Sequence, residues 1–270
     1  MKLTRFREVA IHWSPETRAN RPQDLDDPIW LLNCVSEMYS TALRLGRVSS
    51  KGVRKLNIYL GPNEDQKWDA LISGGIASIR LMDSLSTMNL RDGRAVNSRA
   101  LDMIRQAVSM LACNGILQEA DAISAGEFVL KNGFAQKYAI SKSIDVPAAS
   151  GRNAKLVVGA YFDHVMLSVQ VWRGRRLERE RALFKSWPSA ELLAMSLVNV
   201  EVSATGSMTI LLRDSVPSLL NVSRFGVSKI SFDGLVAGQI SRYEIDDKFA
   251  RICVEFDVSD LFCTDDIGPC

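Results

Sequence analysis

The chain has 270 residues, 47% of them hydrophobic and 24% charged, and its 33 basic and 31 acidic side chains leave a formal net charge of +2. This composition is typical of a globular protein with a substantial core, and it excludes a disordered or fibrous chain. The even charge balance argues against nucleic acid or a membrane surface as a general partner.

The cysteines and the N-terminus bear on the compartment. Five cysteines are widely spread and contain no C-x-x-C pair, which favours free thiols in a reducing environment. The N-terminus, Met-Lys-Leu-Thr-Arg-Phe-Arg-Glu, carries charge where a signal peptide needs an apolar run. No apolar stretch approaches the ~20 residues of a membrane helix. We therefore expect a cytoplasmic protein.

Two helices are predicted in the first half. The first begins at Asp26-Asp27-Pro28, whose carboxylates and proline suit a first turn, and ends at Gly46, which we expect in the left-handed C-cap position. Its apolar residues recur at a spacing of three and four: Trp30, Leu31, Leu32, Val35, Met38, Tyr39, Ala42 and Leu43. The second runs from about Asn97 to Asn114-Gly115 and has a similar apolar face.

Strand patterns lie between and after these helices. Leu56, Ile58 and Leu60 alternate with polar neighbours until Gly61-Pro62-Asn63 closes the strand. Lys131-Asn132-Gly133 separates Phe128-Val129-Leu130 from an alternating run through Tyr138, Ile140, Ile144 and Val146. Because Asn-Gly is a strong hairpin signal, we expect antiparallel pairing there.

The segment 146–153 is rich in turn residues and is the expected linker to a strand-dominated second half. Residues 156–162 and 165–172 predict a hairpin around Asp163-His164, followed by a strand over 177–184. A short helix is expected through Leu192, Leu193 and Met195, then a hairpin that turns at Thr205-Gly206. The last strand alternates cleanly over 250–258. Successive hairpins without intervening helices indicate an antiparallel meander.

These elements predict an α+β fold, with a helix-bearing N-terminal half and an intimately packed C-terminal half rich in antiparallel β-meander. The expected domains are residues 1–146 and 154–270, with one continuous domain as the alternative.

Enzyme signatures are missing from the sequence. No P-loop or dinucleotide-binding glycine motif occurs, and Ser73-Gly74-Gly75, the nearest glycine cluster, is interpreted as a structural turn. The only histidines, His12 and His164, have no metal-spaced companion and lie in no catalytic signature. The sequence therefore indicates no catalytic residue, no metal ligand and no cofactor, and leaves enzymatic activity uncertain.

A run of arginines extends over residues 172–181. Trp172, Arg173, Arg175 and Arg176 are candidate anion-binding residues, because arginine grips phosphate and tryptophan stacks on bases. The interleaved Glu178 and Glu180 favour the competing interpretation, in which the run forms cross-strand ion pairs on a solvated face.

The C-terminal end is acidic. Residues 252–270 contain five carboxylates and no lysine or arginine. We name all five as candidate partner-binding residues: Glu255, Asp257, Asp260, Asp265 and Asp266. The alternative is a solvated end that binds nothing. A basic protein would complement this charge, because charged surfaces steer encounter and exclude wrong partners.

Two functional hypotheses follow. The first is a non-catalytic protein-binding protein, of which an intracellular antidote or immunity-type inhibitor of a basic toxin or nuclease would be one instance. The alternative is an enzyme with carboxylate- or arginine-based chemistry in the cleft between the two halves. The sequence leaves the partner's identity and the oligomeric state open.

Overall fold

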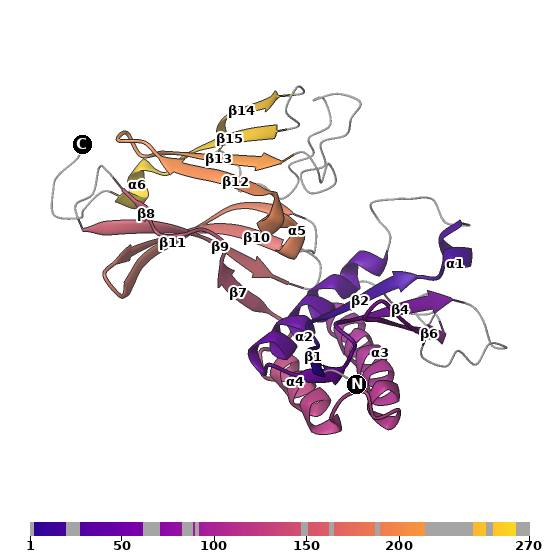
Figure 1. Ribbon diagram of the computed structural model, residues 1–270. Coiled ribbons are helices and arrows are strands. Elements are labelled where there is room, and N and C mark those ends of the chain that lie inside the picture. The colour runs from indigo at the N-terminus through magenta and orange to yellow at the C-terminus, as the bar shows by residue number, and fades with distance from the viewer. Residues whose placement is uncertain are drawn as a thin grey trace. The chain divides into compact units, whose positions relative to one another are not determined.

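The computed structural model describes residues 3–19, 28–61, 71–82, 89, 92–146, 151–161, 165–186, 190–213, 240–246 and 251–262. The fold is α+β, as the sequence predicts, with helices concentrated in the first half and antiparallel sheets in the second (Figure 1). The chain divides into two compact units, Met1–Gln136 with Tyr161–Asp163 and Lys137–Ala160 with His164–Cys270. The segment 146–153 lies within the second unit.

The first unit contains a mixed sheet in the order β2-β4-β6-β5. β2 (Glu8–Trp13), β4 (Lys55–Gly61) and β6 (Ile76–Met82) are parallel, and β5 (Leu71–Ser73) pairs antiparallel with β6. The turn between β5 and β6 holds Gly74 and Gly75 at φ of 58° and 83°, so the glycine cluster is the structural turn that the sequence predicts. A separate ribbon pairs β1 (Leu3–Arg5) with β3 (Ser49–Lys51).

Three helices pack on one face of the mixed sheet: η1 (Pro28–Leu32), α2 (Asn33–Leu45) and α3 (Gly93–Cys113). α4 (Glu119–Lys131) packs on α2 and α3. Strand residues on that face are almost fully buried, for example Ile11, Ile58 and Ile79. The alternation predicted for Leu56, Ile58 and Leu60 is confirmed, since all three have no exposed surface. A short helix, α1 (Pro15–Ala19), directly follows β2.

α3 begins four residues earlier than predicted. The Asp92 carboxylate accepts the Ala95 N–H at 3.0 Å and caps the helix, so the first turn forms ahead of Asn97. Its predicted end is confirmed: Gly115 follows the last turn at φ 64°, and the Ile116 N–H returns to the Leu111 carbonyl at 2.9 Å.

The predicted left-handed position of Gly46 is wrong. Gly46 keeps helical backbone angles, and Arg47 adopts the left-handed conformation at φ 52°. The hydrogen bonds from Arg47 N to Arg44 O and from Val48 N to Leu43 O form a Schellman motif one residue later than the glycine suggests. The motif places Val48 in the core, where 5% of its surface is exposed, and this burial fixes the position at which the helix ends. The start predicted at Asp26 and Asp27 lies outside the described residues.

The hairpin predicted at Lys131-Asn132-Gly133 is also wrong. Phe128-Val129-Leu130 is the last turn of α4, Asn132 is its C-cap, and Gly133 at φ 60° closes a Schellman motif through Phe134 N to Val129 O. Asn-Gly serves a helix end as well as a hairpin, because both need a left-handed residue. The partner of the alternating run is instead β9 (Arg152–Ala160), which pairs with β7 (Gln136–Ala139) and β8 (Ile144–Asp145).

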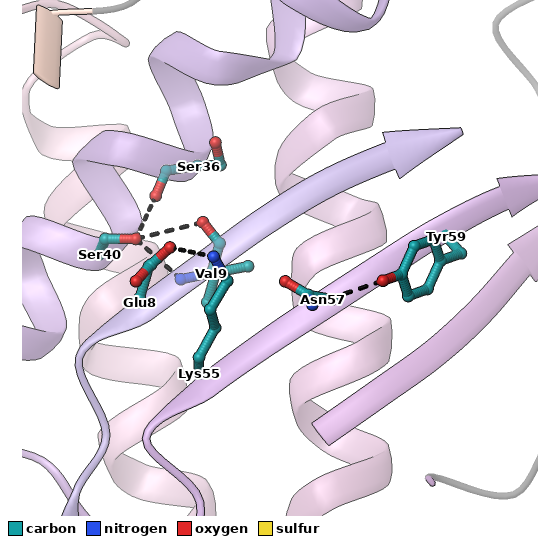
Figure 2. A network of polar contacts seen from close by, with 7 residues as sticks. All are labelled: Glu8, Val9, Ser36, Ser40, Lys55, Asn57 and Tyr59. Atoms are coloured by element: carbon teal, nitrogen blue, oxygen red, sulfur yellow. Dashed lines mark hydrogen bonds and ion pairs between the residues drawn. The ribbon is translucent and has the colours of Figure 1, made fainter. Parts of the chain in front are cut away.

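Ser40 joins helix α2 to the edge strand β2 (Figure 2). Its buried hydroxyl accepts the Val9 N–H at 2.9 Å and lies 2.7 Å from the Ser36 carbonyl, to which it donates. The side chain therefore satisfies a strand group that would otherwise need another strand, and it fixes α2 on the sheet.

The second unit contains two antiparallel sheets. One is the meander of β9 (Arg152–Ala160), β10 (Val165–Arg173) and β11 (Arg176–Ser186), extended by β7 and β8. The predicted hairpin and following strand are confirmed, although the tip at Asp163-His164 lies outside the described residues. α5 (Ala190–Ser196) confirms the predicted short helix.

The other sheet has the order β12-β13-β15-β14. Its strands are β12 (Leu197–Val202), β13 (Ser207–Arg213), β14 (Ile240–Asp246) and β15 (Arg251–Asp257). The hairpin at Thr205-Gly206 and the last strand are confirmed. Buried Met208, Ile210 and Phe256 form the core side of this sheet, and β15 leads into α6 (Ser259–Phe262).

Candidate functional site

Arginines of β9 and β11 hold the backbone that follows β15. Arg152 Nη1 donates to the Phe262 carbonyl at 2.9 Å, Arg181 Nη1 donates to the Asp257 carbonyl at 3.3 Å, and Arg179 Nη1 donates to the Asp260 carbonyl. α6 has a single turn, so its carbonyls lack helical partners and need such donors. The arginine run and the acidic segment, which are far apart in the sequence, are thus joined in one structural element, which we call the arginine–α6 junction.

Ion pairs reinforce the arginine–α6 junction. Arg181 Nη2 pairs with Asp260 Oδ2. Glu178 accepts from Arg152 Nε at 2.6 Å and from Arg173 Nε at 2.9 Å. The Arg152 hydrogen bond lowers the pKa of Glu178, so this carboxylate is anionic at neutral pH. These contacts join Glu178 to arginines of two neighbouring strands, and the Arg152 and Glu178 side chains are only 7% and 18% exposed, so this pair does not lie on a solvated face.

The candidate partner-binding carboxylates occupy different environments. Glu255 is half-buried and accepts the Ser207 hydroxyl. Asp257 is exposed, and bonds from the Ser259 N–H at 3.0 Å and hydroxyl at 2.7 Å lower its pKa. The Asp260 side chain is 66% exposed although it pairs with Arg181. Asp265 and Asp266 lie outside the described residues. The junction therefore presents two accessible carboxylates from a segment that is fixed at three backbone carbonyls.

The candidate anion-binding residues divide between the two faces of the sheet: Arg173 and Arg176 pair in register and share a face, and Trp172 lies on the other. Trp172 and Arg173 are consecutive on β10, so their side chains point to opposite faces. Arg173 pairs with Glu178, whereas Arg175 and Arg176 are exposed at and after the β10–β11 turn. Around Trp172 the structure places other groups: Lys155 Nζ lies 5.3 Å from the ring centroid, and the indole N–H donates to Gln170 Oε1 at 3.2 Å.

The first unit carries a polar sheet face that sequence reasoning missed. On β4, Lys55, Asn57 and Tyr59 alternate with the buried residues and point away from the helices (Figure 2). The Lys55 ammonium pairs with Glu8 on β2, and Arg80 on β6 contacts both Glu16 carboxylate oxygens, at 2.9 and 2.8 Å. The alternation of buried and polar residues along each strand could have indicated this face. It identifies a site only once the parallel pairing of β2, β4 and β6 is known, because that pairing brings the polar side chains into rows.

His12 stands in one of these rows, paired in register with Tyr59, which in turn pairs with Arg80. The imidazole and phenol rings are 5.7 Å apart. Surrounding protein atoms and the nearby Lys55 ammonium lower the pKa of His12, so the imidazole is neutral at physiological pH. A neutral imidazole at a sheet surface can accept a proton or a hydrogen bond. His164 lies outside the described residues.

Within the part of the chain that the structure describes, no group of three or more His, Cys, Asp or Glu side chains is placed to hold a metal ion. None of the helices there combines the length and apolar character that a bilayer crossing requires. Among the cysteines in these described ranges, Cys34, Cys113 and Cys253 form no disulfide bond.

Comparisons of the chain with protein-family models, with curated proteins and with solved structures find no match.

Proposed function

We propose that the chain is a non-catalytic protein-binding protein and that the arginine–α6 junction contacts a basic partner. The observation that carries this proposal is that Asp257 and Asp260 are exposed on a segment whose carbonyls are bound by Arg152, Arg179 and Arg181. Binding to a segment that is already fixed costs less conformational entropy than binding that must first order a mobile loop.

The electrostatics of the junction support this role. Bonds from Ser259 lower the pKa of Asp257, which keeps its exposed carboxylate ionised at neutral pH. Asp260 is engaged by one guanidinium, but its large exposed fraction leaves room for a second cation from a partner. Lysine or arginine side chains are therefore the complementary chemistry, and an antidote that covers a basic toxin or nuclease is one instance of such a binder.

The test is affinity capture by the full chain at low salt, with the captured proteins identified by mass spectrometry. The doubly substituted variant D257K/D260K should capture a basic partner at least ten times less well than the unaltered chain. A second variant, D265K/D266K, tests the end of the acidic segment. The matched control is D145K/E201K, which reverses two exposed carboxylates elsewhere in the same unit and should capture normally.

A charge swap separates binding from folding. The variant R181D/D260R keeps an ion pair on α6 but places a cation where the partner would meet a carboxylate. We expect it to unfold at nearly the temperature of the unaltered chain and still to lose capture. Equal capture by D257K/D260K and by its control would overturn the proposal.

A further inference from the structure

A patch of five cations lies on the first unit, next to the N-terminal ends of β2 and β4. The β1–β3 ribbon and the chain around it place Arg5, Arg7, Arg47, Lys51 and Arg54 at neighbouring backbone positions, which we call the basic patch; the Arg54 guanidinium extends to the Gly74 carbonyl of the β5–β6 turn at 3.5 Å. All five side chains are exposed. Arg5 pairs in register with Ser49, Lys51 with Leu3, and the Arg7 N–H donates to the Arg54 carbonyl at 2.9 Å.

Strand alternation directs these cations outward. Thr4, Phe6, Val48 and Ser50 point toward the core, and Phe6 and Ser50 are at most 1% exposed. The intervening positions Arg5, Arg47 and Lys51 must then face the solvent. Over residues 3–8 and 47–55 the one carboxylate is Glu8, and it pairs with Lys55 rather than with the patch.

Arg47 is placed in the patch at a conformational cost. Three helices of the first unit end in Schellman motifs, and the left-handed residue is glycine in two of them, Gly115 and Gly133. At the end of α2 the left-handed residue is Arg47, at φ 52°. Arginine is strained in this region whereas glycine is not. Glycine would relieve this strain, whereas arginine adds a cation to the patch.

We propose that the basic patch is an interaction surface for an acidic segment of a partner protein. Charge complementarity selects an anionic partner. Leu3, 69% exposed on the same outer face of the ribbon, offers an apolar contact between the cations, which suits a peptide with interspersed acidic and apolar residues. The one aromatic residue of this ribbon region, Phe6, is buried, so the patch has no ring on which bases would stack.

The test measures fluorescence anisotropy of a labelled peptide of alternating glutamate and leucine, titrated with the full chain. A peptide with glutamine in place of glutamate and a short DNA duplex are the comparison probes. We expect the glutamate peptide to bind at least ten times more tightly than either, and its affinity to fall about tenfold as salt rises and screens the charges. Equal binding of the glutamine peptide, or tighter binding of the duplex, would overturn the proposal.

Variants locate the binding. R5E/K51E reverses two cations on the outer face of the ribbon and should weaken binding of the glutamate peptide at least tenfold. R94E/K131E, which reverses two exposed cations at helix ends of the same unit, should change it less than twofold. If both variants bind alike, the basic patch is not the binding surface.

Two further variants separate this surface from misfolding and from the proposed function. R47G relieves the strained backbone, so it should unfold at a higher temperature and yet bind the glutamate peptide less tightly. D257K/D260K, which tests the acidic junction, should bind the glutamate peptide as the unaltered chain does. Failure of the basic patch to bind the glutamate peptide and failure of the acidic junction to capture a basic partner can therefore be told apart.

Discussion

Arg181 and Asp260 form an ion pair across 79 residues of sequence. The first belongs to the arginine run and the second to the acidic segment, the two features of opposite charge that stand out along the chain. Their pairing means that the exposed Asp260 carboxylate of the acidic segment is held by a basic residue of the same unit. The arginines thereby shape the surface that we propose for partner binding.

Two arginines of this junction, Arg152 and Arg181, should differ in their effect on stability. Arg152 is 7% exposed and binds both Glu178 and the Phe262 carbonyl, whereas Arg181 is more exposed and pairs with an accessible carboxylate. Buried groups left without partners cost more than exposed ones. Arg152→Met should lower the thermal midpoint by about 5 °C or more, and Arg181→Met by about 2 °C or less. Similar midpoints for the two variants would contradict the burial difference.

Gly206 should tolerate alanine much less well than Gly174. Both have positive φ, at 83° and 58°, but a Cβ on Gly206 would lie 2.5 Å from Ser259 Cα, whereas one on Gly174 meets nothing within 4 Å. Backbone strain alone predicts a loss of about 1 kcal/mol for Gly174→Ala. Overpacking against α6 adds to it, so Gly206→Ala should lose about 3 kcal/mol. Chemical denaturation of both variants measures the difference.

Arg47→Gly should stabilise the chain by about 1 kcal/mol, because glycine adopts the left-handed conformation without strain. The reverse change at the equivalent position of α4, Gly133→Ala, should cost about the same, since it adds strain but no collision. Urea unfolding checks both signs. A destabilised Arg47→Gly chain would show that the arginine side chain itself supports the helix end.

Tyr39 should lose stability when its hydroxyl is removed. The buried hydroxyl donates to the Ala122 carbonyl at 2.9 Å and links α2 to α4, and burial raises the pKa of the phenol. Tyr39→Phe should cost about 1 kcal/mol. Tyr59→Phe is the matched control: among the residues that the structure describes, its hydroxyl contacts Asn57 at 3.5 Å, a weak hydrogen bond, so its loss should cost less than about 0.5 kcal/mol.

His12 should titrate below the ordinary histidine pKa of 6.5. Because the folded state disfavours the imidazolium, the contribution of His12 to stability is present above pH 6.5 and is lost as pH falls through its lowered pKa. Lys55→Gln removes a neighbouring cation and should raise that pKa. NMR titration of the imidazole protons measures it, with His164→Gln used to assign the signals. A pKa at or above 6.5 in the unaltered chain would contradict this account.

Local patterns predicted most of the individual elements. The buried alternation of Leu56, Ile58 and Leu60, the end of α3 at Asn114-Gly115 and the β9–β10 hairpin all follow from side-chain periodicity and turn residues. These succeed because burial on one face and a left-handed backbone position are local requirements. The same locality explains the error at Asn132-Gly133: the dipeptide provides the left-handed residue, but not the choice between a helix end and a hairpin.

The sequence by itself determined the fold class, the amphipathic faces and the two charged features, since each depends on residue type and spacing. Only the tertiary structure decided which of those features meet. The parallel order of β2, β4 and β6 brings His12, Tyr59 and Arg80 into one row, and the position of α6 brings Arg181 to Asp260. The β1–β3 pairing likewise gathers Arg5 and Lys51 into one patch. Contacts between distant segments depend on the packing of the whole core, which no local spacing encodes.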